Sequence, residues 1–395
     1  MFQAIFVYII FALFMCIFLV EYAYCEKRNK KYSLLYLWLS ILLFSLVFGM
    51  RYGVGIDYLS YLDYYINPYA YYGKSIGMEV GFDFVSKLLY NQGLHFVFFF
   101  GLIAFAQIGF FLFGLKKIPI VLPFVFFCLM TSGILLGGFM NVMRQSISFT
   151  MFVYSIQFIV NKNFVKYLFC ILCASLIHFS AIILIPFYLL AYINVDFTKK
   201  INIQIILYIL SIIVSKIGVF DYIIEFLSKN LFLNQYERTL SIMADTQTTN
   251  LVFNIDFFLR NIVVVIIIIY SDKLKIFFQD KSFVLIYQLF FIGVLLNQIF
   301  SGSMSLNRIN MYFYNYFPVV SGFAICFFYL SRKSSLRYKN LYLFISAIFI
   351  LLFMKDMYAA SLSKSTSKYV FYFEQERYIE KQIELQNVIN ARTQN

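Results

Sequence analysis

Long runs of apolar residues recur along the chain, and they constrain its fold more than any other feature. Residues 2–20, 34–50 and 96–115 each approach the ~20 apolar residues that a helix needs to cross a ~30 Å hydrocarbon layer, and residues 262–270 contribute to another such run. With 62% hydrophobic and 13% charged residues, the chain carries more apolar surface than a water-soluble core can bury. Inside a bilayer every backbone polar group needs an internal partner, so these runs have to be helices. The sequence therefore predicts an all-α, polytopic membrane protein.

Basic residues gather in the short segments between apolar runs, and this pattern predicts the topology. An excess of lysine and arginine marks the cytoplasmic loops of a membrane protein. The basic segments are residues 27–31, 116–117, 162–166, 199–200, 273–281 and 332–339. If all of them are cytoplasmic, both termini lie outside and the chain has about twelve membrane segments. The formal net charge of +13 is spread over these loops, so the sequence predicts no nucleic-acid partner.

One interval between basic segments is too short for two ordinary spans. Only 32 residues separate Lys166 from Lys199, although both lysines are predicted to be cytoplasmic. Two short helices, at residues 167–177 and 181–192, would meet near His178 and form a hairpin without the length of two full spans. Because interrupted helices border the substrate sites of many membrane transporters, the region near His178 is a candidate site.

Several charged or titratable side chains are predicted to reach the outer face, although no rule of topology requires them there. They are Arg51, Asp57, Arg144, His178, Arg238 and Arg308. A guanidinium group binds phosphate oxygens in pairs and keeps its charge, so arginines that converge on one face predict a phosphate or pyrophosphate site. The alternative is that each arginine only extends toward lipid headgroups, without a functional role.

Asp57 and His178 are the candidates for proton transfer. Asp57 follows Gly53 and Gly55, whose conformational freedom allows a loop that turns back toward the bilayer. A simple ion pair between Asp57 and Arg51 is the alternative. His178 interrupts an apolar segment with a side chain that exchanges a proton near neutral pH. The alternative for His178 is a structural imidazole bonded to a backbone carbonyl.

The sequence offers no ligand set for a metal ion and predicts no cofactor. No adjacent pair of carboxylates lies near the first outer loop, and Cys170 and Cys173 stand without a second pair of ligands. Arginines would therefore have to supply the positive charge that a bound cation would otherwise supply beside a pyrophosphate.

The chain contains no segment that reads as a separate soluble domain. We expect residues 1–354 to form the transmembrane domain, with outer loops at 51–93 and 216–256, of which the second is long enough to cover a cavity. Residues 355–395 are expected to form an extracytoplasmic tail with a surface helix. That helix is either solvated or binds a partner such as a chain-length regulator.

Short segments spread along the chain resemble those of a known family. The first outer loop contains Arg51-Tyr-Gly-Val-Gly-Ile-Asp57-Tyr, then Glu79-Val-Gly-Phe82 ahead of Val85-Ser-Lys-Leu-Leu. Further on stand Met143-Arg144-Gln145-Ser-Ile, His178-Phe-Ser180-Ala181 and Arg308-Ile-Asn-Met-Tyr312-Phe313. In order and spacing, the stretch from about residue 45 to about residue 320 resembles the EpsG-type, Wzy-like polymerases of O-antigen, capsule or exopolysaccharide.

The resemblance implies an architecture, an activity and a site. It implies a GT-C-like polymerase of the bacterial cytoplasmic (inner) membrane, with an active site that faces outward. Such an enzyme transfers the growing chain from its undecaprenyl-pyrophosphate carrier to a new lipid-linked oligosaccharide repeat unit. The residues that match the family segments, and that the resemblance places at the site, are Arg51, Asp57, Arg144, Gln145, His178 and Arg308.

Two other functions stay open. A flippase for lipid-linked oligosaccharides would also use arginines and aromatic residues, but it would need charge through the depth of the bilayer, and here the helix interiors are nearly uncharged. A ligase that moves a finished glycan to another acceptor is hardly separated from a polymerase by the sequence.

Overall fold

The computed structural model describes residues 2–55, 57–70, 78–192, 196–217, 255–300, 304–362, 369–374 and 376. Its elements are α1 (Phe2–Lys27), α2 (Ser33–Gly49), α3 (Tyr58–Ile66), α4 (Val80–Asn91), α5 (Phe96–Leu115), η1 (Pro119–Val121), α6 (Leu122–Thr131), η2 (Leu135–Phe139), α7 (Met143–Val160), α8 (Phe164–Ile177), η3 (Phe179–Ala191), α9 (Ile201–Ile217), α12 (Ile255–Ile269), α13 (Ser271–Phe278), α14 (Lys281–Ile299), α15 (Met304–Tyr314), α16 (Tyr316–Leu330), α17 (Leu336–Leu362) and η4 (Tyr372–Glu374). Within these residues the only other regular pairing is an isolated antiparallel bridge between Arg51 and Phe371. The all-α prediction is confirmed for this part of the chain.

Five helical segments in the described residues are long and apolar enough to cross a membrane. They are Gln3–Lys27, Phe96–Leu115, Lys281–Ile299, Leu306–Leu330 and Leu336–Tyr358. Shorter apolar helices accompany them at Ser33–Gly49, Pro119–Thr131, Phe164–Ile177, Phe179–Ala191 and Ile201–Ser215. The protein is a multi-pass membrane protein, as predicted. The total of about twelve membrane segments and the GT-C-like architecture stay predictions.

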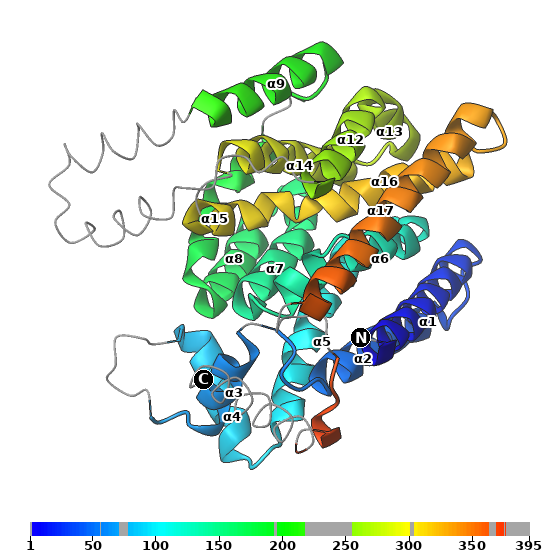
Figure 1. Cartoon of the computed structure of the whole chain (residues 1–395). Coiled ribbons are helices and arrows are strands. Elements are labelled where there is room, and N and C mark those ends of the chain that lie inside the picture. Colours follow the sequence, from blue (N-terminus) through cyan, green and yellow to red (C-terminus); the bar gives the residue numbers. More distant parts are fainter. Residues whose placement is uncertain are drawn as a thin grey trace, which may run out of the picture.

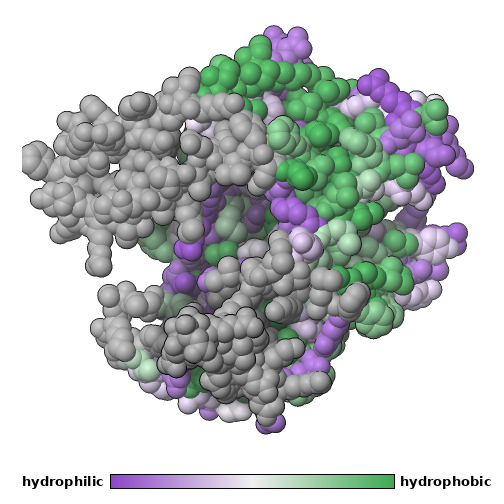
Figure 2. Space-filling view, in the orientation of Figure 1, coloured by the Kyte–Doolittle hydropathy of each residue, from purple (hydrophilic) through white to green (hydrophobic). Residues whose placement is uncertain are grey.

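The helices pack in two connected groups (Figure 1). α2 packs against α1 and α5, α5 against α7, and α7 against α8, while α16 packs against α6, α14 and α17. Contacts between α1 and α6 join the groups. In Figure 1 the basic turns between α1 and α2 and between α16 and α17 lie at the right, whereas α3, α4 and α15 lie at the left. Figure 2 shows a broad hydrophobic surface next to the hydrophilic residues at the right edge, the pattern expected of a protein embedded in a bilayer.

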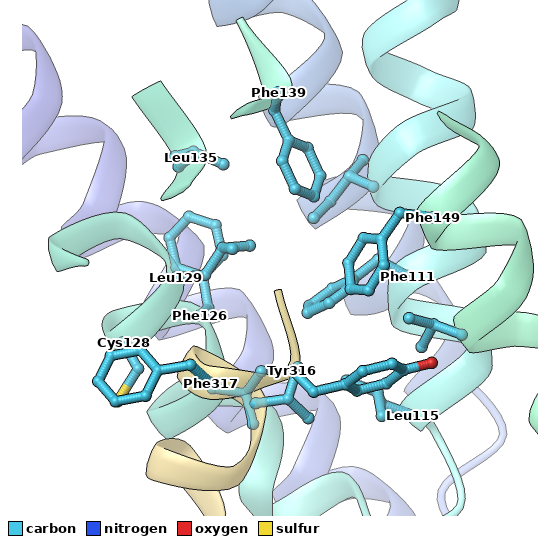
Figure 3. Close-up of a cluster of buried hydrophobic side chains, with 14 of the residues drawn as sticks. Phe111, Leu115, Phe126, Cys128, Leu129, Leu135, Phe139, Phe149, Tyr316 and Phe317 are labelled. Atoms are coloured by element: carbon cyan, nitrogen blue, oxygen red, sulfur yellow. The ribbon is translucent and has the colours of Figure 1, made fainter. Parts of the chain in front are cut away.

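Aromatic side chains fill the space where these helices meet (Figure 3). Phe111 of α5, Phe126 of α6 and Phe149 of α7 are buried together with Phe139 and Phe317. Elsewhere backbones approach so closely that only glycine fits. A Cβ atom on Gly322 of α16 would lie 2.5 Å from the Cα atom of Val125 in α6. Without a hydrophobic driving force in lipid, such close packing is what holds helices together.

The chain between α6 and α7 departs from regular α-helix inside the protein. Gly133 has a φ of +75°, and Leu135–Phe139 forms a single π-helical segment. Irregular backbone inside a membrane protein needs donors for its carbonyl groups. Side chains supply them: Arg260 donates to the Ser132 carbonyl at 2.7 Å, Gln107 to the Phe139 carbonyl at 3.0 Å and Arg51 to the Met140 carbonyl at 3.1 Å. These bonds fix where α7 begins, and with it the positions of Arg144 and Gln145.

The predicted hairpin around His178 is confirmed. α8 ends at Ile177, His178 adopts an extended backbone with φ −151° and ψ 110°, and η3 begins at Phe179. The first helix starts three residues earlier than predicted, at Phe164. The second has 3₁₀ geometry and contains Pro186, which has no backbone N–H to donate. Because α8 and η3 pack against each other, His178 lies at the tip of the hairpin.

The end of the described chain returns to the segment that follows α2. The Tyr52 N–H donates to the Val370 carbonyl, and the Tyr372 N–H donates to the Met50 carbonyl, both at 2.8 Å. Tyr369 is buried there. α17 runs past residue 355 to Leu362 without a break at the expected start of the tail. The predicted surface helix of the tail, Arg238 and nearly all of the loop at 216–256 lie outside the described residues.

Candidate functional site

The candidate site lies where three helix ends meet: the start of α4, the start of α7 and the break between α8 and η3. Glu79 precedes α4 with an extended backbone of φ −59° and ψ 145°. Arg144 and Gln145 stand in the first turn of α7, and His178 occupies the break. A Cβ atom on Gly81 would lie 2.9 Å from the carbonyl oxygen of Leu176, so glycine lets the start of α4 rest on the end of α8. This close approach brings Glu79 beside His178.

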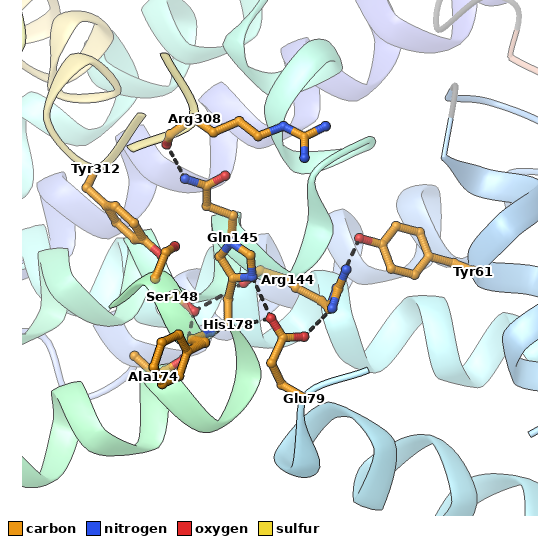
Figure 4. A network of polar contacts seen from close by, with 11 residues as sticks. Tyr61, Glu79, Arg144, Gln145, Ser148, Ala174, His178, Arg308 and Tyr312 are labelled. Atoms are coloured by element: carbon orange, nitrogen blue, oxygen red, sulfur yellow. Dashed lines mark hydrogen bonds and ion pairs between the residues drawn. The ribbon is translucent and has the colours of Figure 1, made fainter. Parts of the chain in front are cut away.

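The Glu79 carboxylate is the centre of a polar network (Figure 4). Its Oε1 lies 2.8 Å from Nδ1 of His178 and accepts a bond from the Phe179 N–H at 3.3 Å. Its Oε2 pairs with Nη1 of Arg144. Between 19% and 25% of each side chain in this trio is exposed, so the network is sheltered but reachable. We call Glu79, Arg144 and His178 the carboxylate-bridged trio.

The trio holds Glu79 as a carboxylate. Burial by itself would raise the pKa of Glu79, but the hydrogen bond with His178 and the charge of Arg144 outweigh that effect and lower the pKa to about 2. Glu79 is therefore ionised at neutral pH and accepts hydrogen bonds from both neighbours.

Arg144 is also held by aromatic side chains of the segment between α2 and α5. Its Nε donates to the Tyr61 hydroxyl at 3.5 Å, and its guanidinium lies 5.9 Å from the ring centres of both Tyr61 and Phe82. Tyr61 belongs to α3 and Phe82 to α4, so the segment between α2 and α5 forms one wall around Arg144. Cation–π contacts of this kind orient a guanidinium without neutralising it.

Gln145 connects the site to α15. Its side-chain amide donates to the backbone carbonyl of Arg308, while its buried Oε1 has no hydrogen-bond partner among the described residues. The Arg308 side chain is exposed, and in Figure 4 it extends from α15 toward the side of the network where Arg144 and Tyr61 lie. Tyr312, one turn further along α15, has its hydroxyl 3.0 Å from the Ser180 hydroxyl of η3. The late segment of the chain thus reaches the same site as α7 and the hairpin.

Arg51 lies apart from this network. It is 1% exposed, donates to the Met140 carbonyl, and has the rings of Phe48, Tyr58 and Phe100 5.6 to 5.8 Å from its guanidinium carbon. Burial lowers its pKa to about 10, so it still carries a charge at neutral pH. The guanidinium therefore supports the irregular segment before α7 rather than facing an open surface.

Asp57 is also outside the carboxylate-bridged trio. It precedes α3 and is partly buried, and the structure, which describes both residues, records no ion pair between Asp57 and Arg51. The structure thus brings together Arg144, Gln145, His178 and the backbone of Arg308. It does not bring Arg51 and Asp57 into contact with them.

Sequence reasoning missed Glu79, the residue that organises the site. It stands in one of the segments that carry the family resemblance, and a carboxylate in a loop predicted to lie outside was the available signal. Its partners are 65 and 99 residues away along the chain, so only the fold shows the contact. The hydroxyl groups of Tyr61 and Tyr312 were likewise not assigned to the site.

A second ionic cluster, also missed, is structural. Arg260 of α12 donates to Asp256 at 2.9 Å and to the Ser132 carbonyl, and Lys355 of α17 lies 2.9 Å from Asp256. The cluster ties α12 and α17 to the irregular segment that precedes α7.

Comparison with known proteins places the chain in a family. A family model described as the EpsG family matches residues 34–321, which is 288 of the 395 residues and includes Glu79, Arg144, Gln145, His178 and Arg308. No curated protein and no solved structure gives a significant match. The chain belongs to the EpsG family, the family of Wzy-like polysaccharide polymerases.

Proposed function

We propose that this protein joins oligosaccharide repeat units carried on undecaprenyl pyrophosphate, on the outer side of the bacterial cytoplasmic membrane. The growing chain moves from its lipid carrier to a terminal hydroxyl of a new lipid-linked unit. The observation that carries the proposal is the carboxylate-bridged trio, which sets a cation and a proton acceptor side by side in a protein of this family.

In this proposal Arg144 and Arg308 bind the departing diphosphate. Two guanidinium groups set in place before the reaction stabilise the negative charge that develops on the leaving group. Both side chains are partly or fully exposed. Arg144 also lies in the first turn of α7, whose N-terminus carries the positive end of the helix dipole and has no side-chain cap on its first N–H groups. No metal ion has a role in the proposal, and polymerisation in the presence of a chelator tests this point.

His178 takes the proton from the attacking hydroxyl. With Nδ1 donating to Glu79, Nε2 carries the lone pair that accepts a proton. The acceptor oxygen forms a bond to the anomeric carbon while the bond from that carbon to the diphosphate oxygen breaks. The proton moves to Nε2, and the Glu79 carboxylate stabilises the imidazolium that results. Attack opposite the leaving group inverts the anomeric centre.

Arg51 and Asp57 have different places in the proposal. Because the Arg51 guanidinium is buried and bonded to the Met140 carbonyl, we assign it to positioning α7 rather than to phosphate binding. Asp57 is kept as the second candidate base, since it lies at the start of α3, the helix that carries Tyr61.

The outward orientation of the site rests on the basic loops. The turns between α1 and α2 and between α16 and α17 are basic and lie at the right of Figure 1, and α3, α4 and α15 lie at the left. The positive-inside rule assigns the basic side to the cytoplasm and therefore the side of the trio to the periplasm or exterior.

Loss of the protein in the cell tests the proposal. A strain without the polymerase should display glycan of a single repeat unit on its surface, and the wild-type gene should restore long chains. Arg144→Lys should fail to restore them, whereas Arg28→Lys, an exposed arginine between α1 and α2, should succeed. Complete absence of surface glycan in the deletion strain would instead indicate a flippase.

A further inference from the structure

The short helix α4 exposes a stripe of apolar side chains. Val80, Phe84 and Leu88 are 76%, 65% and 45% exposed, and their spacing of four residues places them on one helix face. On another face Phe82 and Ser86 are buried, with the Phe82 ring against Tyr61. α4 has 12 residues, so it is too short to cross a bilayer. An amphipathic helix of this kind lies in the membrane interface with its apolar face among acyl chains.

A second apolar stripe continues from the first. On α8 the exposed side chains Val165, Phe169, Leu172 and Leu176 follow helical spacing along the whole helix. The start of α4 rests on the end of α8, where the space beside Gly81 is filled by Leu176. The two stripes therefore approach each other where Gly81, the residue after Val80, packs on Leu176.

The point where the stripes approach each other borders the polar network. Val80 directly follows Glu79, and the N–H of Phe179, whose side chain is 68% exposed, donates to the Glu79 carboxylate. Two exposed apolar side chains thus flank the carboxylate that holds Arg144 and His178. The site has a charged centre and an apolar border that continues along α8.

We propose that this apolar track, defined as Val80, Phe84, Leu88, Leu172, Leu176 and Phe179, binds the isoprenoid tail of the lipid-linked substrate. This inference rests on the proposed function and adds the route by which the substrate arrives. The substrate enters laterally from the outer leaflet: its diphosphate binds Arg144 while its isoprenoid tail remains in contact with the apolar track. A water-soluble nucleotide-sugar donor, which has a diphosphate but no tail, would gain nothing from such a border, so the chemistry favours a polyprenyl diphosphate.

Kinetics with two carriers test the track. Purified protein is given repeat units on undecaprenyl diphosphate or on a short, water-soluble prenyl diphosphate. Phe84→Ser and Leu176→Ser should raise KM for the long-tailed carrier about tenfold, because each removes apolar contact area, and should leave kcat and the short-tailed reaction unchanged. Phe6→Ser is the matched control, since Phe6 on α1 is 66% exposed, and it should change neither. Equal KM values for Phe84→Ser and Phe6→Ser would overturn the inference.

The same assay separates the inference from the proposed function. If wild-type protein extends neither carrier, the proposed function fails. If it extends both with equal KM, polymerisation stands and the tail-binding track is wrong.

A fluorescence measurement checks the position of α4 without any turnover. The chain has a single tryptophan, Trp38, so Phe84→Trp in a Trp38→Phe background reports on one site. Lipids with brominated acyl chains should quench this tryptophan, and added undecaprenyl diphosphate should reduce the quenching. Fluorescence that is insensitive to brominated lipid would place α4 away from the bilayer and contradict the proposal.

Discussion

Oε1 of Glu79 lies 2.8 Å from Nδ1 of His178, although 99 residues separate the two along the chain. The same carboxylate pairs with Arg144 through its other oxygen. One residue therefore orients both the proposed base and a proposed phosphate ligand, and replacing it should affect both functions at once.

Glu79→Gln preserves the shape of the side chain and removes its charge. The amide no longer stabilises the imidazolium of His178, so we expect polymerisation to slow about 100-fold, in the range attributed to general base catalysis. The rate of chain extension with lipid-linked repeat units measures this effect. Glu79→Asp, which keeps the charge at a shorter reach, should recover part of the rate, and wild-type turnover by Glu79→Gln would remove Glu79 from the mechanism.

Arg144→Lys keeps the positive charge and removes the planar donor pair. Because a lysine cannot bind two phosphate oxygens with fixed geometry, we expect a fall of about 100-fold in kcat. Arg28→Lys serves as the control in the same assay and should retain full activity. Full turnover by the Arg144 variant would exclude it from leaving-group stabilisation.

The depressed pKa of Glu79 makes the stability of the protein depend on pH. A carboxylate whose pKa is lower in the folded state stabilises the fold above its unfolded pKa, and that stability is lost as the pH falls through the folded pKa. For Glu79 the contribution is complete above about 4.5 and disappears toward about 2. Thermal unfolding in detergent should show wild type more stable than Glu79→Gln at neutral pH, with a difference that shrinks below pH 4.5. A difference that stays constant down to about pH 3 would show that the charge of Glu79 does not stabilise the fold.

Substitutions of Arg51 and Arg308 should affect different properties: the stability of the protein for Arg51 and its activity for Arg308. Arg51→Leu leaves the buried Met140 carbonyl without its donor, and we expect a loss of about 1–3 kcal/mol of stability. Arg308→Leu removes a proposed ligand of the diphosphate, so it should slow polymerisation. Because the Arg308 side chain is exposed, the thermal unfolding temperature should not change. The opposite result, a stable Arg51→Leu protein that binds lipid diphosphate poorly, would return Arg51 to the phosphate site.

The features that depend on a local sequence pattern, namely the apolar helices and the hairpin, could be predicted from the sequence. Apolar runs of spanning length predicted the membrane helices, and the short interval between Lys166 and Lys199 predicted the hairpin that breaks at His178. His178, an ionisable residue inside an apolar segment, was enough to mark the break. An ionisable side chain is costly within a lipid-exposed helix, so such residues are rare there.

Contacts between distant segments could not be predicted in this way. Arg51 stands at the end of an apolar run like any interfacial arginine, and only the irregular segment at Met140, 89 residues further on, explains its burial. The pairing of Tyr52 with Val370 is equally invisible to local pattern. For the same reason the sequence predicted Arg144 and His178 one by one as site residues, but not the carboxylate that joins them.

The most direct test of the account is chain extension by the purified protein. Wild type and His178→Ala are placed in liposomes with undecaprenyl-pyrophosphate-linked repeat units, and the products are separated by length. The account predicts a ladder of chain lengths with wild type and single repeat units with His178→Ala. Single units with wild type, or the same ladder with both proteins, would contradict it.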